Sequence, residues 1–187
     1  RCALTAKNGA ARWIGQPPTD LTIDPGMNPL TAVAHTLQAL HTDPAGGLPP
    51  LTSGLVGYMG YDMVRYIEDL PDTCEDDLSV PDMVQLLVED MAVVDHHEGA
   101  VWLIANVINW DNSDARVDEA YDEAIARIDA MTSRLAAGQA RGVDTFSTPQ
   151  PFPRRQRSQD DHFDRIEKCK EHIRAGDAFQ IVLSQRF

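Results

Sequence analysis

The last residues of the chain carry polar side chains at spacings that could serve a binding site. The stretch GDAFQIVLSQRF (176–187) alternates apolar and polar residues, which predicts an extended strand. Alternation places Phe179, Ile181, Leu183 and Gln185 on one face and Ala178, Gln180, Val182, Ser184 and Arg186 on the other. The amide of Gln180 can donate and accept hydrogen bonds without ionising. This half-polar face suits either the solvent-exposed edge of a sheet or the wall of a binding site.

Other groups that could carry chemistry have simpler interpretations. His96 and His97 are adjacent, so their rings would point to opposite faces of an extended chain, and a solvated turn is favoured over a shared metal. The acidic run Glu75–Asp77 is interpreted as a solvated loop, since three neighbouring carboxylates do not by themselves define a Mg²⁺ site. GLVGYMGYD (54–62) lacks the spacing of phosphate-binding loops and is interpreted as a strand interrupted by glycines. No serine or cysteine nucleophile has a recognisable partner.

Composition limits the classes of function. Of 187 residues, 29 are acidic and 16 are basic, and the net charge is −13. Such a charge disfavours nucleic acid and anionic membrane surfaces as partners. No apolar run approaches the roughly 18 residues of a membrane span, and no secretory signal is visible. The widely spaced Cys2, Cys74 and Cys169 fit no zinc spacing and are interpreted as reduced thiols of a cytoplasmic protein.

Two segments are predicted to be β-hairpins. Asn8-Gly9, a favoured two-residue turn, lies between the strands of residues 2–15. Residues 83–110 are predicted to form two long strands around His97-Glu98-Gly99. Residues 51–71 start as a strand and turn into a short helix, with glycines that allow a bulge or a close backbone approach. Antiparallel strands combined with helices favour an α+β fold with an antiparallel or mixed sheet.

Three helices are predicted from apolar residues that recur at helical spacing. The apolar stripes are Leu30, Val33, Leu37 and Leu40 in residues 28–41; Val117, Tyr121, Ala124, Ile128, Met131 and Leu135 in residues 113–136; and Phe163, Ile166, Cys169 or Lys170, and Ile173 in the last helix. The predicted N-caps are Asn28 for the first helix and Ser113 or Asp114 for the second, and Gly176 is predicted to end the third.

The predicted organisation has three parts. Residues 1–136 form an α+β domain, and residues 137–158 are an exposed linker, because they lack a helical period and are rich in Gly, Pro, Ser and Arg. Residues 159–187 then begin a second domain that the sequence does not complete. The first residue is Arg1 rather than Met, so the N-terminus is expected not to be the native one.

Two motifs are distinctive enough to compare with known enzymes. They are GDAFQIVLSQRF (176–187) and GLVGYMGYDMVRYIEDLP (54–71), and the intervening PDMVQLLVEDMAVVDHHEGAVWLIAN (81–106) fits with them. Together they resemble anthranilate synthase component I, in the chorismate-utilising enzyme family, and are most similar to its actinobacterial members. The resemblance covers nearly all of the chain. It implies the N-terminal part of that family's sandwich fold and a fragment that lacks most of the active site.

The resemblance implies the large, lyase subunit of the first step of tryptophan biosynthesis, which converts chorismate and ammonia into anthranilate and pyruvate. It implies a glutamine amidotransferase subunit that supplies the ammonia, and tryptophan as a feedback inhibitor, although the family's Leu-Leu-Glu-Ser and Asn-Pro-Ser-Pro-Tyr-Met inhibitor motifs are absent from this sequence. Mg²⁺ would be bound by a C-terminal domain, so no metal ligand is expected in this chain. Two alternatives stay open: aminodeoxychorismate synthase component I of the folate pathway and, for this polypeptide alone, a non-catalytic structural or partner-docking domain.

The resemblance also implies a role for Gln180. Family members that add water to chorismate carry Lys at the aligned position, and water needs a general base, which a Lys of lowered pKa can supply. Neutral ammonia is already nucleophilic, and Gln cannot take up a proton at any relevant pH. Gln180 is therefore expected to orient the ligand or nucleophile of an amination. The alternative is that its amide only makes a hydrogen bond within the sheet.

Overall fold

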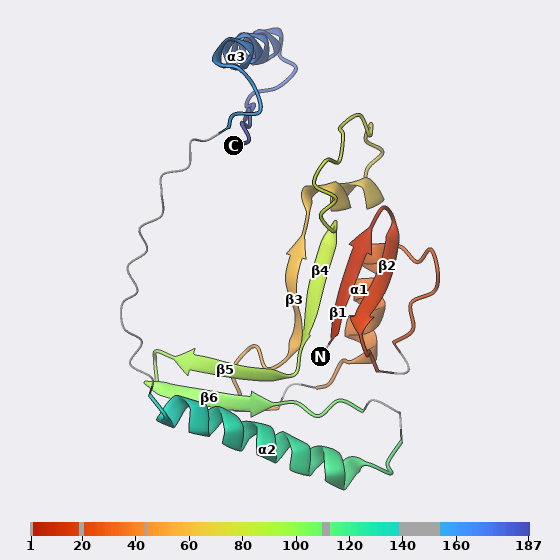
Figure 1. Cartoon of the computed structure of the whole chain (residues 1–187), viewed down its shortest axis with the longest axis vertical. Helices are drawn as coiled ribbons and strands as arrows, with labels where there is room; N and C mark the ends of the chain where they lie inside the picture. The colour runs from red at the N-terminus through yellow and green to blue at the C-terminus, as the bar shows by residue number, and fades with distance from the viewer. Residues whose placement is uncertain (1, 19–20, 44, 110–112, 139–153) are drawn as a thin grey trace. The chain divides into compact units, whose positions relative to one another are not determined.

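The computed structural model describes residues 2–18, 21–43, 45–109, 113–138 and 154–187. The described residues form antiparallel strands and helices, which confirms the α+β class (Figure 1). The elements are β1 (Cys2–Lys7), β2 (Ala10–Gly15), α1 (Pro29–Ala39), β3 (Gly54–Met59), the 3₁₀ helix η1 (Tyr61–Tyr66), β4 (Met83–Val88), β5 (Asp90–Asp95), β6 (Ala100–Ala105), α2 (Val117–Ala136) and α3 (Gln159–Ala175). The chain divides into two compact units, Arg1–Gln139 and Ala140–Phe187.

A four-stranded antiparallel sheet of order β2-β1-β4-β3 forms the centre of the first unit. Asn8 and Gly9 adopt φ values of 50° and 84°, so the predicted hairpin turn is confirmed. Gly57 of β3 provides the predicted close backbone approach. A Cβ at this position would lie 1.8 Å from the carbonyl oxygen of Val84 in β4, so only glycine lets these two strands pair in this way.

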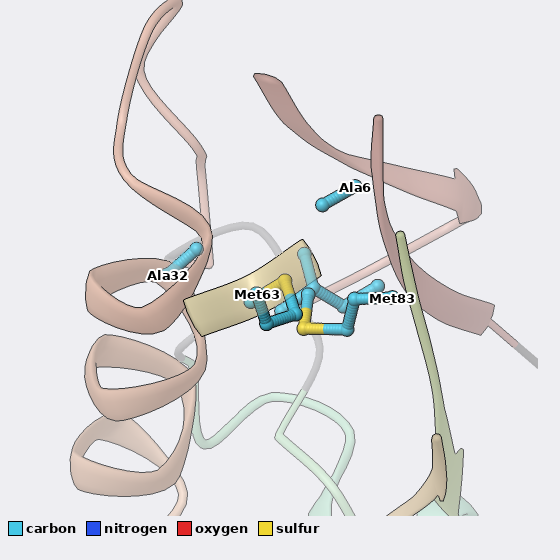
Figure 2. Close-up of a cluster of buried hydrophobic side chains, with 5 residues drawn as sticks. Ala6, Ala32, Met63 and Met83 are labelled. Carbon is cyan, nitrogen blue, oxygen red and sulfur yellow. The ribbon is translucent and has the colours of Figure 1, made fainter. Parts of the chain in front are cut away.

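The core lies between one face of this sheet, α1 and η1. Its fully or nearly fully buried members are Leu4, Ala6, Ala32, Met63 and Met83. Figure 2 shows the side chains of Met63 and Met83 meeting between α1 and the strands. Methionine is unbranched and adapts its shape, so two methionines can fill the irregular space where a helix, a 3₁₀ turn and a sheet meet.

Helix α1 begins as predicted, but its most buried positions lie beside the predicted stripe. The Oδ1 of Asn28 accepts a hydrogen bond of 2.8 Å from the backbone N of Leu30, so the predicted N-cap is confirmed. The buried positions of the helix are Pro29, Ala32 and Thr36. Of the predicted stripe, Leu30, Val33 and Leu40 are half-buried and Leu37 is exposed. Small side chains bring the helix backbone close to the core, and the Thr36 hydroxyl is satisfied by donating to the Ala32 carbonyl at 2.8 Å.

The first long strand predicted in residues 83–110 is wrong, because it breaks at Glu89 into strands of two different sheets. β4 belongs to the four-stranded sheet, and β5 pairs with β6 in a second, two-stranded sheet. The carbonyl of Glu89 accepts from the backbone N of Asn106 at 2.8 Å and from its side-chain Nδ2 at 2.9 Å. The same Nδ2 donates to the Thr52 carbonyl at 2.8 Å, so one side chain holds the junction together. The predicted turn before β6 is confirmed at residues 96–99.

Helix α2 is shorter and less buried than its pattern predicts. It begins at Val117 after Arg116, so the predicted cap at Ser113 or Asp114 is wrong. Within the described residues, Ala124 is its one buried side chain. Three members of the predicted stripe are exposed: Val117, Tyr121 and Leu135. Among the helices that the structure describes, none combines the length and apolar character that a membrane span requires.

Helix α3 begins and ends at well-defined caps in the second unit. The Oγ of Ser158 accepts from the backbone N of Asp161 at 3.2 Å, and Gly176 ends the helix with a left-handed φ of 86°, as predicted. Of the predicted inward stripe, Ile166 and Cys169 are half-buried and Phe163 and Ile173 are exposed, and no described residue of α3 is fully buried. Residues 139–153 of the predicted linker lie outside the described residues, so the division at 137–158 stays a prediction.

The second face of the four-stranded sheet carries an apolar row. The strand register aligns Ile14 with Ala3, Ala3 with Leu86, and Leu86 with Val56 across all four strands. Ile14, Leu86 and Val56 are exposed, so no described residue covers this row. The face opposite is the core face that α1 covers.

Substitutions on the two faces are expected to differ in cost. Leu4 is 0% exposed on the core face, and Leu86, on the neighbouring strand, is 53% exposed on the open face. Leu4→Ala should lower the free energy of unfolding by about 2–5 kcal/mol, because it removes buried contacts and leaves a cavity. Leu86→Ala should cost less than about 1 kcal/mol. Urea unfolding of both variants measures this, and equal losses would contradict the assignment of the core face.

Candidate functional site

Gln180 lies in residues 177–187, which follow α3 without regular secondary structure. The predicted terminal strand is wrong, because among the described residues no neighbouring strand pairs with it, and alternating side chains alone do not make a strand. The Gln180 side chain is exposed, as are Phe179 (94%) and Val182 (83%) beside it. Both interpretations of Gln180, a position at a sheet edge and a role in binding, stay predictions.

The C-terminal cap of α3 fixes where this segment begins. The backbone N of Asp177 donates to the His172 carbonyl at 3.0 Å, and Gly176 provides the left-handed turn that this bond requires. The Asp177 Oδ2 lies 2.8 Å from the Nδ1 of His172. The chain therefore leaves the helix from a defined position, and Gln180 follows shortly after Asp177.

Residues just before α3 hold the far end of the same segment. The backbone N of Gln156 donates to the Arg186 carbonyl at 3.0 Å, and the Nη1 of Arg157 donates to the Ser184 carbonyl at 3.4 Å. The Nε of Arg157 also lies 3.7 Å from the Oδ2 of Asp161 in the first turn of α3. Gln180 therefore lies between two tied ends, one at each end of the helix.

The predicted acidic loop is exposed, as expected, but one of its carboxylates is paired. Lys7 at the end of β1 forms an ion pair with Asp76, donates to the Val80 carbonyl at 2.7 Å and lies 3.3 Å from the Oδ1 of Asp82. The hydrogen bond from Lys7 lowers the pKa of Asp76 below its ordinary value, and the same bond raises the pKa of Lys7. These contacts tie the loop to the end of the four-stranded sheet.

A cavity of about 370 Å³ beside α2 was not foreseen from the sequence. On its wall, the Nη1 of Arg127 lies 2.7 Å from the Oδ1 of Asp90 and 3.6 Å from the Oε2 of Glu89, and its Nη2 donates to the Asn106 carbonyl at 2.8 Å. Two carboxylates neutralise this guanidinium, so the cluster serves to join α2 to the junction between the two sheets. The features of the sequence that could have indicated this cluster are Arg127, beside the apolar stripe of the predicted helix, and the acidic pair Glu89 and Asp90.

The other groups singled out from the sequence do not gather into a site. His96 and His97 are exposed in the turn between β5 and β6, as expected. The three cysteines are unpaired, and burial raises the pKa of the Cys2 thiol, which makes it a poor nucleophile. Within the described residues, no three His, Cys, Asp or Glu side chains lie together in a way that could hold a metal ion.

The family model described as "chorismate binding enzyme" matches residues 3–187. The chain belongs to this family. Among its relatives, anthranilate synthase component 1 of Mycolicibacterium smegmatis is 49% identical over 185 residues, which cover 99% of this chain and 35% of the relative. Anthranilate synthase component 1 of Arthrobacter globiformis is 40% identical over 100% of this chain and 36% of the relative. The resemblance seen in the sequence is therefore confirmed.

A solved structure supports the fold of this family member. Anthranilate synthase component I from Streptococcus pneumoniae matches 98% of this chain and 38% of its own chain, with a TM-score of 0.70 and 22% identity. Aminodeoxychorismate synthase component 1 of Bacillus subtilis is 33% identical over 85% of this chain and 32% of the relative. The chain thus spans about a third of the length of the curated relatives it matches.

The ion pair of Asp76 gives a pH prediction. Because its pKa is lowered in the folded chain, the contribution of this pair is present above the ordinary Asp pKa of about 3.9 and is lost as the pH falls through the lower, folded value. An NMR titration of the Asp76 carboxylate should therefore have its midpoint below about 3.9. Lys7→Met should move that midpoint back up, and Lys168→Met on α3 should not. An unchanged Asp76 midpoint in Lys7→Met would show that the pair has no effect.

Proposed function

We propose that this chain forms part of the large subunit of an anthranilate synthase, which aminates chorismate and releases anthranilate, pyruvate and water. The observation that carries the proposal is the 49% identity over 185 residues to the M. smegmatis enzyme. The A. globiformis relative supports it at 40% identity. Because the chain spans about a third of these relatives, the complete reaction is proposed for a protein of the relatives' length that contains this chain.

Gln180 supports amination over hydration. Ammonia in its neutral form needs no base to attack, whereas water does. A primary amide offers one acceptor and two donor hydrogens and does not titrate, so it can orient a ligand but cannot remove its proton. The exposed position of Gln180 leaves its amide accessible to a ligand. Its proposed role is to orient ammonia or chorismate.

Three further components belong to the same proposal. A glutamine amidotransferase subunit would supply ammonia, and tryptophan would act as feedback inhibitor. Mg²⁺ would bind at the active site together with chorismate. The protein would be located in the cytoplasm. The described residues do not fit Mg²⁺, since no three candidate ligands lie together among them. The ligands of the metal are proposed to lie in the part of the relatives that this chain does not match.

Two other candidate functions have specific support. The B. subtilis relative, at 33% identity over 161 residues, favours aminodeoxychorismate synthase component I as the second candidate. The exposure of α3 and of the Gln180 segment favours a non-catalytic structural or docking role for the isolated chain. An exposed segment does not exclude water from a reacting substrate, so the described residues around Gln180 do not form the enclosed site that such chemistry requires.

The main proposal predicts that this chain can replace its counterpart in a working enzyme. In a chimaera, residues 1–187 replace the matching 185 residues of the M. smegmatis protein. With chorismate, Mg²⁺ and an ammonium salt, the chimaera is expected to form anthranilate, measured by its fluorescence. The isolated 187-residue chain is expected to form none.

The matched control places the chain in the B. subtilis aminodeoxychorismate enzyme, in place of the matching 161 residues. Activity of this second chimaera alone would favour the second candidate. If both chimaeras fold, as judged by circular dichroism, and neither is active, the proposed function is wrong. Anthranilate formed in proportion to the concentration of the isolated chain would contradict its non-catalytic role.

Two substitutions at Gln180 test its role in the M. smegmatis chimaera. Gln180→Ala removes one or two hydrogen bonds to the ligand and should lower the rate by about 5- to 150-fold, equivalent to about 1–3 kcal/mol. No ionisation should disappear from the pH profile, because Gln has none. Gln180→Lys should impair amination and allow traces of isochorismate, because it introduces a charge and a possible base.

Gln38→Ala provides the control, since Gln38 is an exposed glutamine on α1. It should leave the rate and the KM for chorismate unchanged. The role of Gln180 would be refuted if Gln180→Ala behaved like Gln38→Ala at saturating ammonia.

A further inference from the structure

Among the described residues, the segment that carries Gln180 has little packing to hold it, and Leu183 is only half-buried. Phe179, Val182 and Phe187 are all exposed, and no described strand pairs with the segment. An unpaired extended chain samples many backbone conformations, and restricting each residue is entropically unfavourable. A side chain that orients a substrate needs a fixed backbone beneath it. Among the described residues, the contacts at the two ends of the segment are therefore the restraints on the position of Gln180.

At the far end, Arg157 connects the segment to α3. Its guanidinium reaches the Ser184 carbonyl at 3.4 Å through Nη1 and the Asp161 carboxylate at 3.7 Å through Nε. Asp161 is itself held by the Nε of Arg165 at 3.0 Å. The adjacent backbone bond from Gln156 to the Arg186 carbonyl, at 3.0 Å, supports the same end.

Arginine suits this position for a chemical reason. Its planar guanidinium presents several N–H donors in a fixed geometry, so one side chain can contact a carbonyl and a carboxylate at the same time. A lysine ammonium carries a similar charge on a flexible stem without that geometry. The Arg157 side chain is 29% exposed, whereas its hydrogen bond to Ser184 lies at the surface.

We infer that Arg157 is a positioning residue for Gln180. By tying the Ser184 carbonyl to the first turn of α3, it restricts the backbone between Asp177 and Ser184, and Gln180 lies inside that interval. The effect on catalysis rests on the proposed function, but the restraint on the backbone can be measured in this chain alone.

The first test measures the backbone by NMR relaxation in the 187-residue chain. Arg157→Ala should lower the order parameters of residues 180–186 from about 0.8 to below about 0.6. Arg157→Lys should give intermediate values. The matched control is Arg155→Ala, which removes the same charge from an exposed residue two positions away. Unchanged order parameters in Arg157→Ala would overturn the inference.

The second test is a double-mutant cycle in the active M. smegmatis chimaera. Arg157→Ala should lower kcat about 10-fold while the KM for chorismate changes less than about 2-fold, because orientation and not binding is lost. In the Gln180→Ala background, Arg157→Ala should lower kcat less than about 2-fold, since there is no longer an amide to position. If instead Arg157→Ala lowers kcat by the same factor with and without the Gln180 amide, the two residues act independently, and the link between them would be overturned. An inactive parent chimaera would refute the proposed function. The NMR relaxation result would then show on its own whether Arg157 restrains the backbone of residues 180–186.

Discussion

Strand β4 forms backbone hydrogen bonds with a neighbouring strand on each of its two edges, and the rest of the first unit depends on this double pairing. β1 and β3 pair with it on opposite sides, and Met83 at its start lies in the core. Gln85 is buried within the strand, which is unfavourable unless its amide is bonded, and its Nε2 donates to the Tyr58 carbonyl at 3.2 Å. Just before the strand, the backbone of Asp82 donates to Ala6 at 2.8 Å and accepts from Gly60 at 2.7 Å. Both neighbours are thus held in register at the same end.

Local features of this fold were predictable from the sequence, and most non-local ones were not. The Asn8-Gly9 turn and the Asn28 cap depend on residues that are close in sequence, so their residue types suffice to predict them. The break at Glu89 depends on Asn106, which is remote in sequence and bonds to its carbonyl. The buried face of α1 depends on how closely the helix approaches the sheet, which a hydrophobic period does not specify.

The same distinction applies to the candidate site. Gln180 could be singled out because it lies in a motif that resembles a known family, and Gly176 could be predicted as the end of the helix before it, whereas the contacts of Arg157 that tie the other end of the segment could not. The contacts of Arg157 and the pair of Lys7 with Asp76 join residues far apart in sequence, and charged residues on loops have no period that reveals their partners. In α3, the apolar stripe was visible, but a stripe indicates a surface suited to burial and does not supply the element that covers it.

The strand order β2-β1-β4-β3 has a consequence for synthesis on the ribosome. The β1–β2 hairpin is complete within the first 15 residues, but the other edge of β1 waits for β4, where Leu86 pairs with Ala3. β4 ends at Val88, 73 residues after β2 ends at Gly15, and at about 5–20 residues per second this stretch takes about 4–15 s to synthesise. Throughout that interval the nascent hairpin presents unpaired N–H and C=O groups beside the apolar Leu4 and Ala6. Until β4 is synthesised, this edge of β1 is therefore open to pairing with another polypeptide.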